Sequence, residues 1–208
     1  VGFVNAGMMK VAQAIGIIMG ANIGTSITGW VLCLSYIEGS NGLAQLLSTA
    51  TISAVVSIIG ILFKTISKKS TYKNVGDIML GFSILMLGMQ SMSSAVSNLK
   101  GDERFTNMFT MFSNPIMGIL VGILFTAVLQ SASASIGILQ ALSVTGAITF
   151  ATAFPITMGI GVGAACPVLL SSIGTNKNGK RTALIYLMND LFGMLFWSIT
   201  FYLIHAIV

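Results

Sequence analysis

Charged side chains are scarce in this sequence, and their scarcity excludes a soluble domain. Only 7% of the 208 residues are charged and 55% are hydrophobic, whereas a soluble globular domain carries about 25% charged residues. A chain of this composition cannot cover itself with a polar surface in water. The sequence therefore predicts an integral membrane protein that has the lipid bilayer as a partner.

Residues that build catalytic and metal sites are also few. The chain has two cysteines and one histidine, and Cys33 and Cys166 both lie in apolar segments, so no disulfide framework is predicted. A serine nucleophile needs an activating base, and no histidine or lysine is expected beside Ser131. We therefore expect no enzyme and no cofactor. The net charge of +5 does not call for nucleic acid as a partner, because the lysines gather in short loops.

Strand-like alternation of polar and apolar residues is absent, whereas long apolar runs are plentiful. Several of these runs reach the roughly 20 residues that a helix needs to cross a bilayer. The fold class predicted is an all-α, polytopic helical membrane protein. The apolar runs lie near residues 1–20, 21–37, 45–64, 75–97, 114–147, 150–173 and 182–208.

The charges between these runs predict how the chain sits in the cell membrane. Loops 64–74 and 176–181 are rich in lysine and are therefore expected in the cytoplasm. Loop 36–42 has one charge, Glu38, and is expected outside, as is the mixed loop 100–107. The run 114–147 is then best explained by a re-entrant hairpin that enters and leaves on one side. The polar stretch QSASAS, residues 130–135, falls where that hairpin would turn.

An internal repeat relates the two ends of the chain. When the sequence is aligned with itself so that Met19 lies on Met158, MGANIGTSIT (19–28) falls on MGIGVGAACP (158–167). The loops after the two copies differ in charge, which places them on opposite membrane faces. This arrangement predicts an inverted-topology repeat, as in secondary transporters. The identical pairs of this repeat alignment are Gly7/Gly146, Ala12/Ala151, Ala14/Ala153, Ile17/Ile156, Met19/Met158, Gly20/Gly159 and Gly24/Gly163.

The repeat alignment also predicts how the chain is divided. The first repeat is expected over 1–69 and the second over 113–208. A linking helix and loop over 70–112 would join them.

Two polar stretches within apolar runs are the candidate binding elements. GANIGTSITG (20–29) predicts a helix interruption whose carbonyl, amide and hydroxyl oxygens suit sodium; the alternative is close helix packing through Gly20 and Gly24. At 130–135, a hairpin tip would expose helix N–H groups that attract anions, and its serines and glutamine could bind an anion or a cation. The alternative there is a kink stabilised by serines that bond back to carbonyls.

These two elements carry a family resemblance. GANIGTSIT and the later Gln-Ser-x-Ser resemble the signatures of the sodium-dependent phosphate cotransporter family, the type II Na/Pi cotransporters and their bacterial branch. The segment LLSSIGTNKNGKRTALIYLMNDLFG (169–193) also resembles the second-repeat tail of bacterial members. The resemblance covers essentially the whole chain. It implies two inverted repeats, re-entrant hairpins, interrupted helices and sodium-driven import of inorganic phosphate by alternating access.

The resemblance also implies site residues. The substrate set comprises hairpin-tip residues, namely Gln130, Ser131, Ser133 and Ser135. The sodium set combines the first repeat's helix break with two residues of the hairpin tip. It comprises Asn22, Thr25, Ser26, Thr28, Gln130 and Ser131. Sodium is the only metal ion expected. The family often forms homodimers, so a homodimer is an expectation here too.

Several departures from the family pattern leave alternatives open. At the hairpin tip, Ala132 replaces a signature serine. In the second break, side-chain oxygens are missing, so sodium binding there is in doubt. Gly161, Ala164 and Pro167 stand where the first repeat has Asn22, Thr25 and Thr28. By the repeat alignment, the first Gln-Ser-Ser-Ser would fall before Val1, and we expect sequence to precede it in the natural protein. The alternatives are a sodium-coupled transporter of another oxyanion and a transport-incompetent fragment or subunit.

One intramembrane acid lies in the resembling segment 169–193 but in neither of the two signature elements. Asp190 lies within the last apolar run, where an ionisable residue is a functional candidate by default. It also follows the basic loop closely enough that an ion pair with Lys180 or Arg181 is the alternative.

Overall fold

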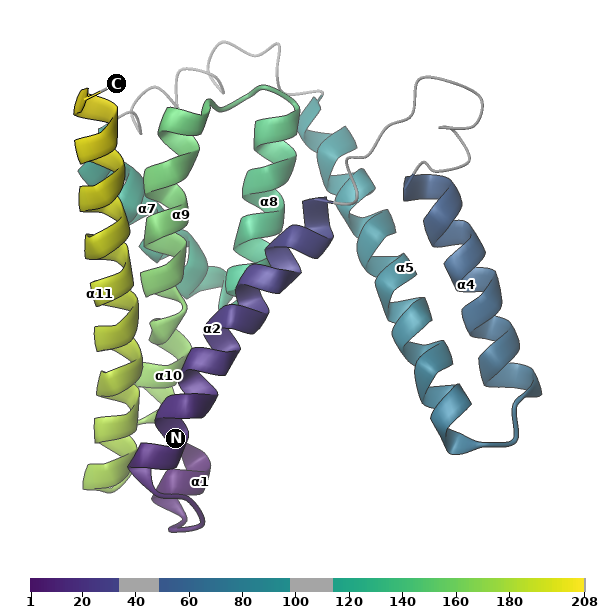
Figure 1. The fold of residues 1–208 in the computed structure, drawn as a ribbon, viewed down its shortest axis with the longest axis horizontal. Helices are drawn as coiled ribbons and strands as arrows, with labels where there is room; N and C mark the ends of the chain where they lie inside the picture. Colours follow the sequence, from purple (N-terminus) through teal and green to yellow (C-terminus); the bar gives the residue numbers. More distant parts are fainter. Residues whose placement is uncertain (34–48, 98–113, 208) are drawn as a thin grey trace.

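The computed structural model of the chain describes residues 1–33, 49–97 and 114–207, and all regular structure in these ranges is helical. Figure 1 shows the helices running mostly along one common direction. The helices are α1 (Gly2–Asn5), α2 (Val11–Cys33), α4 (Thr49–Ile66), α5 (Ser70–Ser97), α7 (Pro115–Leu129), α8 (Ala132–Val144), α9 (Phe150–Gly163), α10 (Ala165–Ser171) and α11 (Lys177–Ile207).

The structure repeats itself in the register of the repeat alignment. Helix α2 begins at Val11 and α9 begins at Phe150, and the alignment places these two residues on each other. The turns before them each contain a glycine with positive φ, 75° at Gly7 and 73° at Gly146. Three backbone hydrogen bonds also recur, and their N–H donors pair as Ala6 with Thr145, Gly7 with Gly146, and Met8 with Ala147. The short α1 therefore matches the last turn of α8.

The two copies run in opposite directions. In Figure 1 the turn between α1 and α2 lies at the bottom, and the turn between α8 and α9 lies at the top. Helix α2 consequently runs upward, whereas α9 and α10 run downward. The fold is thus an inverted-topology repeat, as predicted, while the predicted residue boundaries of the two repeats stay a prediction.

Helices α7 and α8 form the predicted re-entrant hairpin. They contain 15 and 13 residues, fewer than the roughly 20 that cross a bilayer. The chain reverses at Gln130, whose φ of 54° and ψ of 24° are left-handed, and Ser131 then caps α8. Figure 1 shows the tip about halfway along α11. The stretch QSASAS therefore lies at the depth of the membrane interior.

A glycine contact between α7 and α9 fixes the hairpin against the following helix of the same repeat. A Cβ atom added at Gly159 would collide with the main-chain oxygen of Ile119, and one added at Gly122 would collide with that of Ile156. Small residues allow this close approach, and lipid provides no hydrophobic force to replace it. Buried apolar residues of α8 and α9 extend the packing, among them Leu139, Ile156 and Ile160.

Helix α2 is continuous, so the interruption predicted over 20–29 is wrong. Its side-chain hydroxyls bond back to carbonyls one turn earlier, and in lipid a backbone that keeps its own hydrogen bonds avoids a large cost. A Cβ at Gly20 or Gly24 would meet nothing within 4 Å, so these glycines do not pack against another helix either. The second repeat has only a slight interruption, at Ala164 between α9 and α10.

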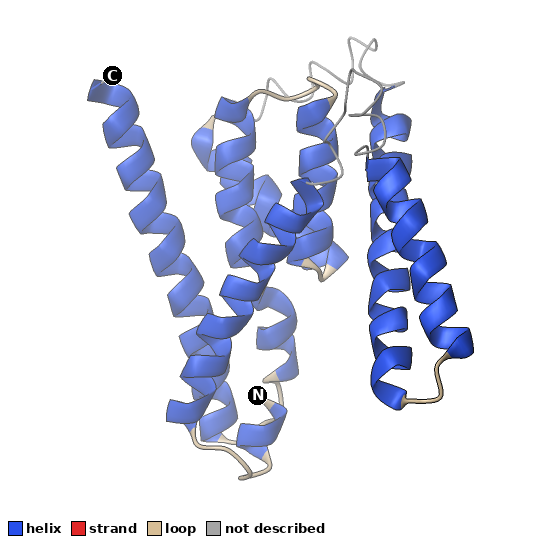
Figure 2. Ribbon diagram, turned by 45° about the vertical axis from the view of Figure 1, so that its right-hand side comes forward, coloured by secondary structure: helices blue, strands red, loops and turns tan. Residues whose placement is uncertain are grey.

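Helices α4 and α5 form a second hairpin beside the repeats, as Figure 2 shows. The Lys64 Nζ and Asp77 Oδ1 atoms lie 2.5 Å apart near its turn, and the buried Ser83 hydroxyl donates to the Ser53 carbonyl across it. On the other side of α5, Met89 packs against Gly137 of α8. The α4–α5 hairpin therefore contacts the second repeat through α8.

Within the described residues, four helical segments are long and apolar enough to cross a membrane, over Val11–Cys33, Ser70–Met92, Phe150–Ser171 and Lys177–Ile207. Many large apolar side chains are exposed along them, such as Trp30, Ile84 and Phe192, as expected for lipid-facing surfaces. The turns at 67–69 and 172–176, which belong to or adjoin the lysine-rich loops, lie at the same end of the molecule in Figure 1. Loops 36–42 and 100–107, predicted outside, lie beyond the described residues.

This arrangement predicts which turns face the cytoplasm. In a variant whose Cys33 and Cys166 are replaced by alanine, a cysteine at Lys68 should react with a membrane-impermeant maleimide only in inside-out vesicles. A cysteine at Ser143 should react only in intact cells. Labelling of both positions from the same side would contradict the inverted arrangement.

The glycine contact predicts a stability difference between two neighbouring glycines of α9. Gly159→Ala should lower the free energy of unfolding by about 1–3 kcal/mol, since its Cβ displaces the α7 backbone. Gly161→Ala is the matched control, because a Cβ there meets nothing within 4 Å. Thermal unfolding in detergent measures both, and equal losses would contradict the proposed contact.

Candidate functional site

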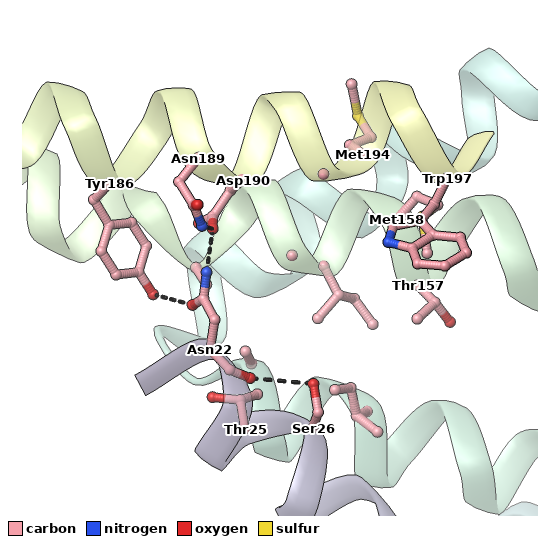
Figure 3. Close-up of a pocket in the computed structure, with 16 residues that line it drawn as sticks. Asn22, Thr25, Ser26, Thr157, Met158, Tyr186, Asn189, Asp190, Met194 and Trp197 are labelled. Atoms are coloured by element: carbon pink, nitrogen blue, oxygen red, sulfur yellow. Dashed lines mark hydrogen bonds between the residues drawn. The ribbon is translucent and has the colours of Figure 1, made fainter. Parts of the chain in front are cut away.

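A pocket of about 300 Å³ lies where the two repeats meet, between α2, α8, α9 and α11 (Figure 3). Its walls are largely apolar, with polar side chains gathered on α2 and α11. Its lining consists of Asn22, Thr25, Ser26, Ala132, Ile136, Thr157, Met158, Ile160, Gly161, Ala164, Tyr186, Asn189, Asp190, Gly193, Met194 and Trp197.

The position of the pocket follows from the repeat. The repeat alignment places Asn22 and Thr25 of the first repeat on Gly161 and Ala164 of the second, and all four line the pocket. The pocket therefore lies between equivalent points of the two repeats. Only the first repeat brings oxygen-bearing side chains to these positions.

Asn22 joins the two repeats through its side-chain amide. Its Nδ2 atom donates to Asp190 Oδ1 at 2.6 Å, and its Oδ1 atom accepts from the Tyr186 hydroxyl at 3.3 Å. Tyr186 and Asp190 are separated by one helical turn and therefore share one face of α11. Figure 3 shows this face turned toward α2.

Asp190 is buried and only partly satisfied. It exposes 8% of its surface, and its Oδ1 atom also accepts from Asn189 Nδ2 at 3.3 Å. Its Oδ2 atom is buried without a hydrogen-bond partner among the described residues. The alternative of an ion pair with Lys180 or Arg181 is wrong, because both are exposed near the start of α11, roughly 14 Å along the helix axis from Asp190. No ion pair in the described ranges involves this carboxylate.

The hydroxyls predicted for the sodium site are held by their own helix. Thr25 donates to the Ala21 carbonyl at 3.1 Å, Ser26 to that of Asn22 at 3.1 Å and Thr28 to that of Gly24 at 3.0 Å. A hydroxyl that donates its proton keeps lone pairs that can accept or ligate a cation. Thr25 and Ser26 line the pocket, whereas Thr28 does not.

The hairpin-tip residues lie next to the pocket but not in its lining. Gln130 is exposed, and its side chain bonds to no described residue. The Ser131 hydroxyl accepts from the Ala134 N–H at 3.3 Å and so caps α8. Ser133 is half-buried, and Ser135 is fully buried, where its hydroxyl accepts from Thr126 and donates to the Ser131 carbonyl. From this hairpin Ala132 and Ile136 line the pocket instead.

Sequence reasoning missed part of the pocket. Tyr186 and Asn189 of α11 lie in the resembling segment 169–193 but were assigned no role, and Thr157 lies immediately before the recognised MGIGVGAACP. The signal that could have found Tyr186 is its spacing of one helical turn from the intramembrane Asp190. Among the described residues no group of three or more histidines, cysteines and acids could hold a metal ion. The donor set of amide, hydroxyl and carboxylate oxygens suits a hard cation.

Comparison with known proteins identifies the family. The sequence pattern of the Na+/Pi-cotransporter family matches the chain twice, over residues 1–94 and 84–202. The chain belongs to the Na+/Pi-cotransporter family. The two matched ranges contain the two oppositely directed copies described above.

Relatives of this Na+/Pi-cotransporter family member occur in bacteria and mammals. YjbB of Escherichia coli, named as a putative inorganic phosphate export protein, is 23% identical over 93% of this chain and 33% of its own length. YqeW of Bacillus subtilis is 22% identical over 93% of this chain and 59% of its own. Sodium-dependent phosphate transport protein 2A of Rattus norvegicus is 30% identical over 57% of this chain and 20% of its own.

The chain thus spans about a third of the length of YjbB and under two thirds of YqeW. No solved structure matches it significantly.

The link between Asn22 and Asp190 predicts an asymmetry among α2 substitutions. Asn22→Ala should lower the free energy of unfolding by about 1–3 kcal/mol, because it removes the 2.6 Å hydrogen bond to a buried carboxylate. Ser26→Ala should cost less than about 0.5 kcal/mol, since its hydroxyl bonds only within its own helix. Thermal unfolding measures both, and a larger loss for Ser26→Ala would contradict this reading of the pocket.

Proposed function

We propose that this protein is a sodium-coupled symporter that imports inorganic phosphate by alternating access. The observation that carries the proposal is a pocket between matched positions of two inverted repeats in a member of the Na+/Pi-cotransporter family. Secondary transporters bind substrate and ion near the membrane midplane at such a repeat interface.

Sodium would bind among the oxygens that α2 brings to the pocket. Asn22, Thr25 and Ser26 supply an amide and two hydroxyl oxygens on one stretch of helix. Because α2 is continuous, these ligands would be side chains and not free carbonyls. Thr28 lies outside the pocket lining and would need a rearrangement to join them.

Phosphate would bind at the tip of the α7–α8 hairpin. The first N–H groups of α8 have no partner within the helix, and the N-terminus of a helix favours an anion. Gln130 is exposed at this tip, with Ser131 and Ser133 beside it and Ser135 bonded beneath.

Among the described residues, no arginine takes part in this proposed phosphate site. Of the two arginines of the chain, Arg181 is exposed near the start of α11 and does not line the pocket, and Arg104 lies outside the described residues. Amides and hydroxyls would therefore supply the hydrogen bonds that arginine supplies at other phosphate sites.

Alternating access would follow from the opposite directions of the repeats. The α7–α8 hairpin and α9 are closely packed through glycine contacts, so they would move as one rigid body. The link from Asn22 to α11 joins the first repeat to the second. A change at this link would open the pocket to one side of the membrane and close it to the other.

Direction and substrate have alternatives. The name of YjbB refers to export of inorganic phosphate, so outward movement is the second candidate. Another oxyanion is a further alternative, since neutral donors discriminate poorly between oxyanions. The cell membrane as location and a homodimer as assembly stay predictions.

The proposal predicts phosphate uptake into proteoliposomes that contain the protein. Radiolabelled phosphate should accumulate with an inward sodium gradient and not with potassium. Gln130→Ala should reduce uptake by about tenfold or more, the factor that ~1.4 kcal/mol of lost binding represents. Gln13→Ala is the matched control, because Gln13 is exposed at the start of α2 and, among the described residues, its side chain bonds only to the Lys10 N–H.

Several outcomes would change the conclusion. Equal uptake in sodium and potassium would contradict sodium coupling, and preferential sulfate or arsenate uptake would identify another oxyanion. Phosphate loss from loaded vesicles under an outward sodium gradient, without uptake under an inward one in a uniformly oriented preparation, would establish export.

A further inference from the structure

The buried carboxylate of Asp190 is the feature of the pocket that the family signatures do not explain. One of its oxygens accepts from Asn22 and Asn189, and the other, Oδ2, is buried with no hydrogen-bond partner in the described part of the chain. The residue exposes only 8% of its surface and lies in the middle of a helix long enough to span the membrane. An ionised carboxylate in such a place is costly unless its charge is compensated.

The described elements around Asp190 bring no positive side chain to it. On α11 itself the neighbours in the pocket are Tyr186, Asn189 and Trp197. None of the described groups around the carboxylate is a cation, so within the described part of the chain the compensating charge would come from a bound ion or a proton. The other helices present Asn22, Thr25 and Ser26 from α2, Ala132 and Ile136 from α8, and Thr157 and Met158 from α9.

The oxygens that line the same pocket as the carboxylate favour a bound ion. The amide oxygen of Asn22 accepts one hydrogen bond, from Tyr186, and retains a second lone pair. The hydroxyls of Thr25 and Ser26 have donated their protons to carbonyls, so their lone pairs are available. A proton on Oδ2, by contrast, would have no acceptor in the described part of the structure. One fixed negative charge among neutral hard oxygens is suited to a small monovalent cation.

We propose that Asp190 is the charged ligand of a sodium site in this pocket, completed by Asn22 and the hydroxyls of Thr25 and Ser26. This inference deepens the proposed function and rests on it for the identity of the ion. It places the charge of the site on the second repeat and most neutral ligands on the first. Binding of the ion would therefore bridge the two repeats at the contact that has to change during alternating access.

The site makes two predictions that a purely structural carboxylate does not. Asp190→Asn removes the buried charge and keeps the shape of the side chain, so in sodium-free solution the variant should unfold at a higher temperature than the wild type. The same variant should lose the stabilisation by sodium, with the half-saturating sodium concentration raised about tenfold or more. A carboxylate that only holds Asn22 in place would give a variant of lower stability with or without sodium.

The experiment is thermal unfolding of the purified protein in detergent, followed by tryptophan fluorescence, for which Trp197 in the pocket is a local probe. Sodium chloride is exchanged against choline chloride at constant ionic strength. Asp77→Asn is the matched control: it makes the same chemical change at an exposed carboxylate paired with Lys64, and it should keep the full sodium response. Asp190→Glu, which keeps the charge, should respond to sodium at a shifted concentration and serves if Asp190→Asn does not fold.

Three results would overturn the assignment. They are an unchanged sodium response in Asp190→Asn, no sodium response in the wild type, and stabilisation of the wild type by acid in place of sodium.

The two proposals can fail separately. If sodium-driven phosphate uptake survives Asp190→Asn with an unchanged sodium requirement, Asp190 is not the ligand and the proposed function stands. If sodium stabilises the wild type through Asp190 but no phosphate moves, the sodium site stands and the proposed function fails.

Discussion

The absence of water in the membrane interior is the constraint on which this structure depends. Every backbone group and every charge at that depth has to be satisfied by the protein itself. Helix α2 meets the constraint by staying continuous, and its threonines and serine bond back to its own carbonyls. The α7–α8 hairpin meets it with a Ser131 cap and a buried Thr126–Ser135 hydrogen bond. Asp190 meets it only in part, because its Oδ2 atom has no hydrogen-bond partner among the described residues. This unpaired oxygen is the reason for proposing a bound ion.

The sequence was a good guide wherever a pattern repeated or broke a long apolar run. Aligning the chain with itself predicted the inverted repeat, which the matched turns at Gly7 and Gly146 display in atomic detail. The run 114–147 was too long for one span, and QSASAS correctly marked the hairpin turn. Both inferences rest on local chemistry and on length, which a single sequence contains.

Other features depended on which helices become neighbours, and a single sequence does not contain that information. Gly20 and Gly24 were taken to interrupt α2 or to pack against another helix, yet they face open space, and the close contact is made by Gly122 and Gly159. The pairing of Asn22 with Asp190 spans 168 residues, so no spacing rule could reveal it. The loss of polar residues from the second break looked like a weakened site, whereas in the structure α11 supplies polar side chains to the same pocket.

The central claim is that the pocket between the repeats binds the coupling ion of a phosphate transporter. A cryo-electron microscopy structure in sodium and phosphate, compared with one in choline, tests it most directly. The account predicts that the sample with sodium and phosphate shows density for a bound ion between Asn22 and Asp190, and density for phosphate at the Gln130–Ser133 tip. The sample in choline should show no ion density between Asn22 and Asp190. An identical pocket under both conditions, with phosphate and ion density elsewhere in the protein, would contradict it.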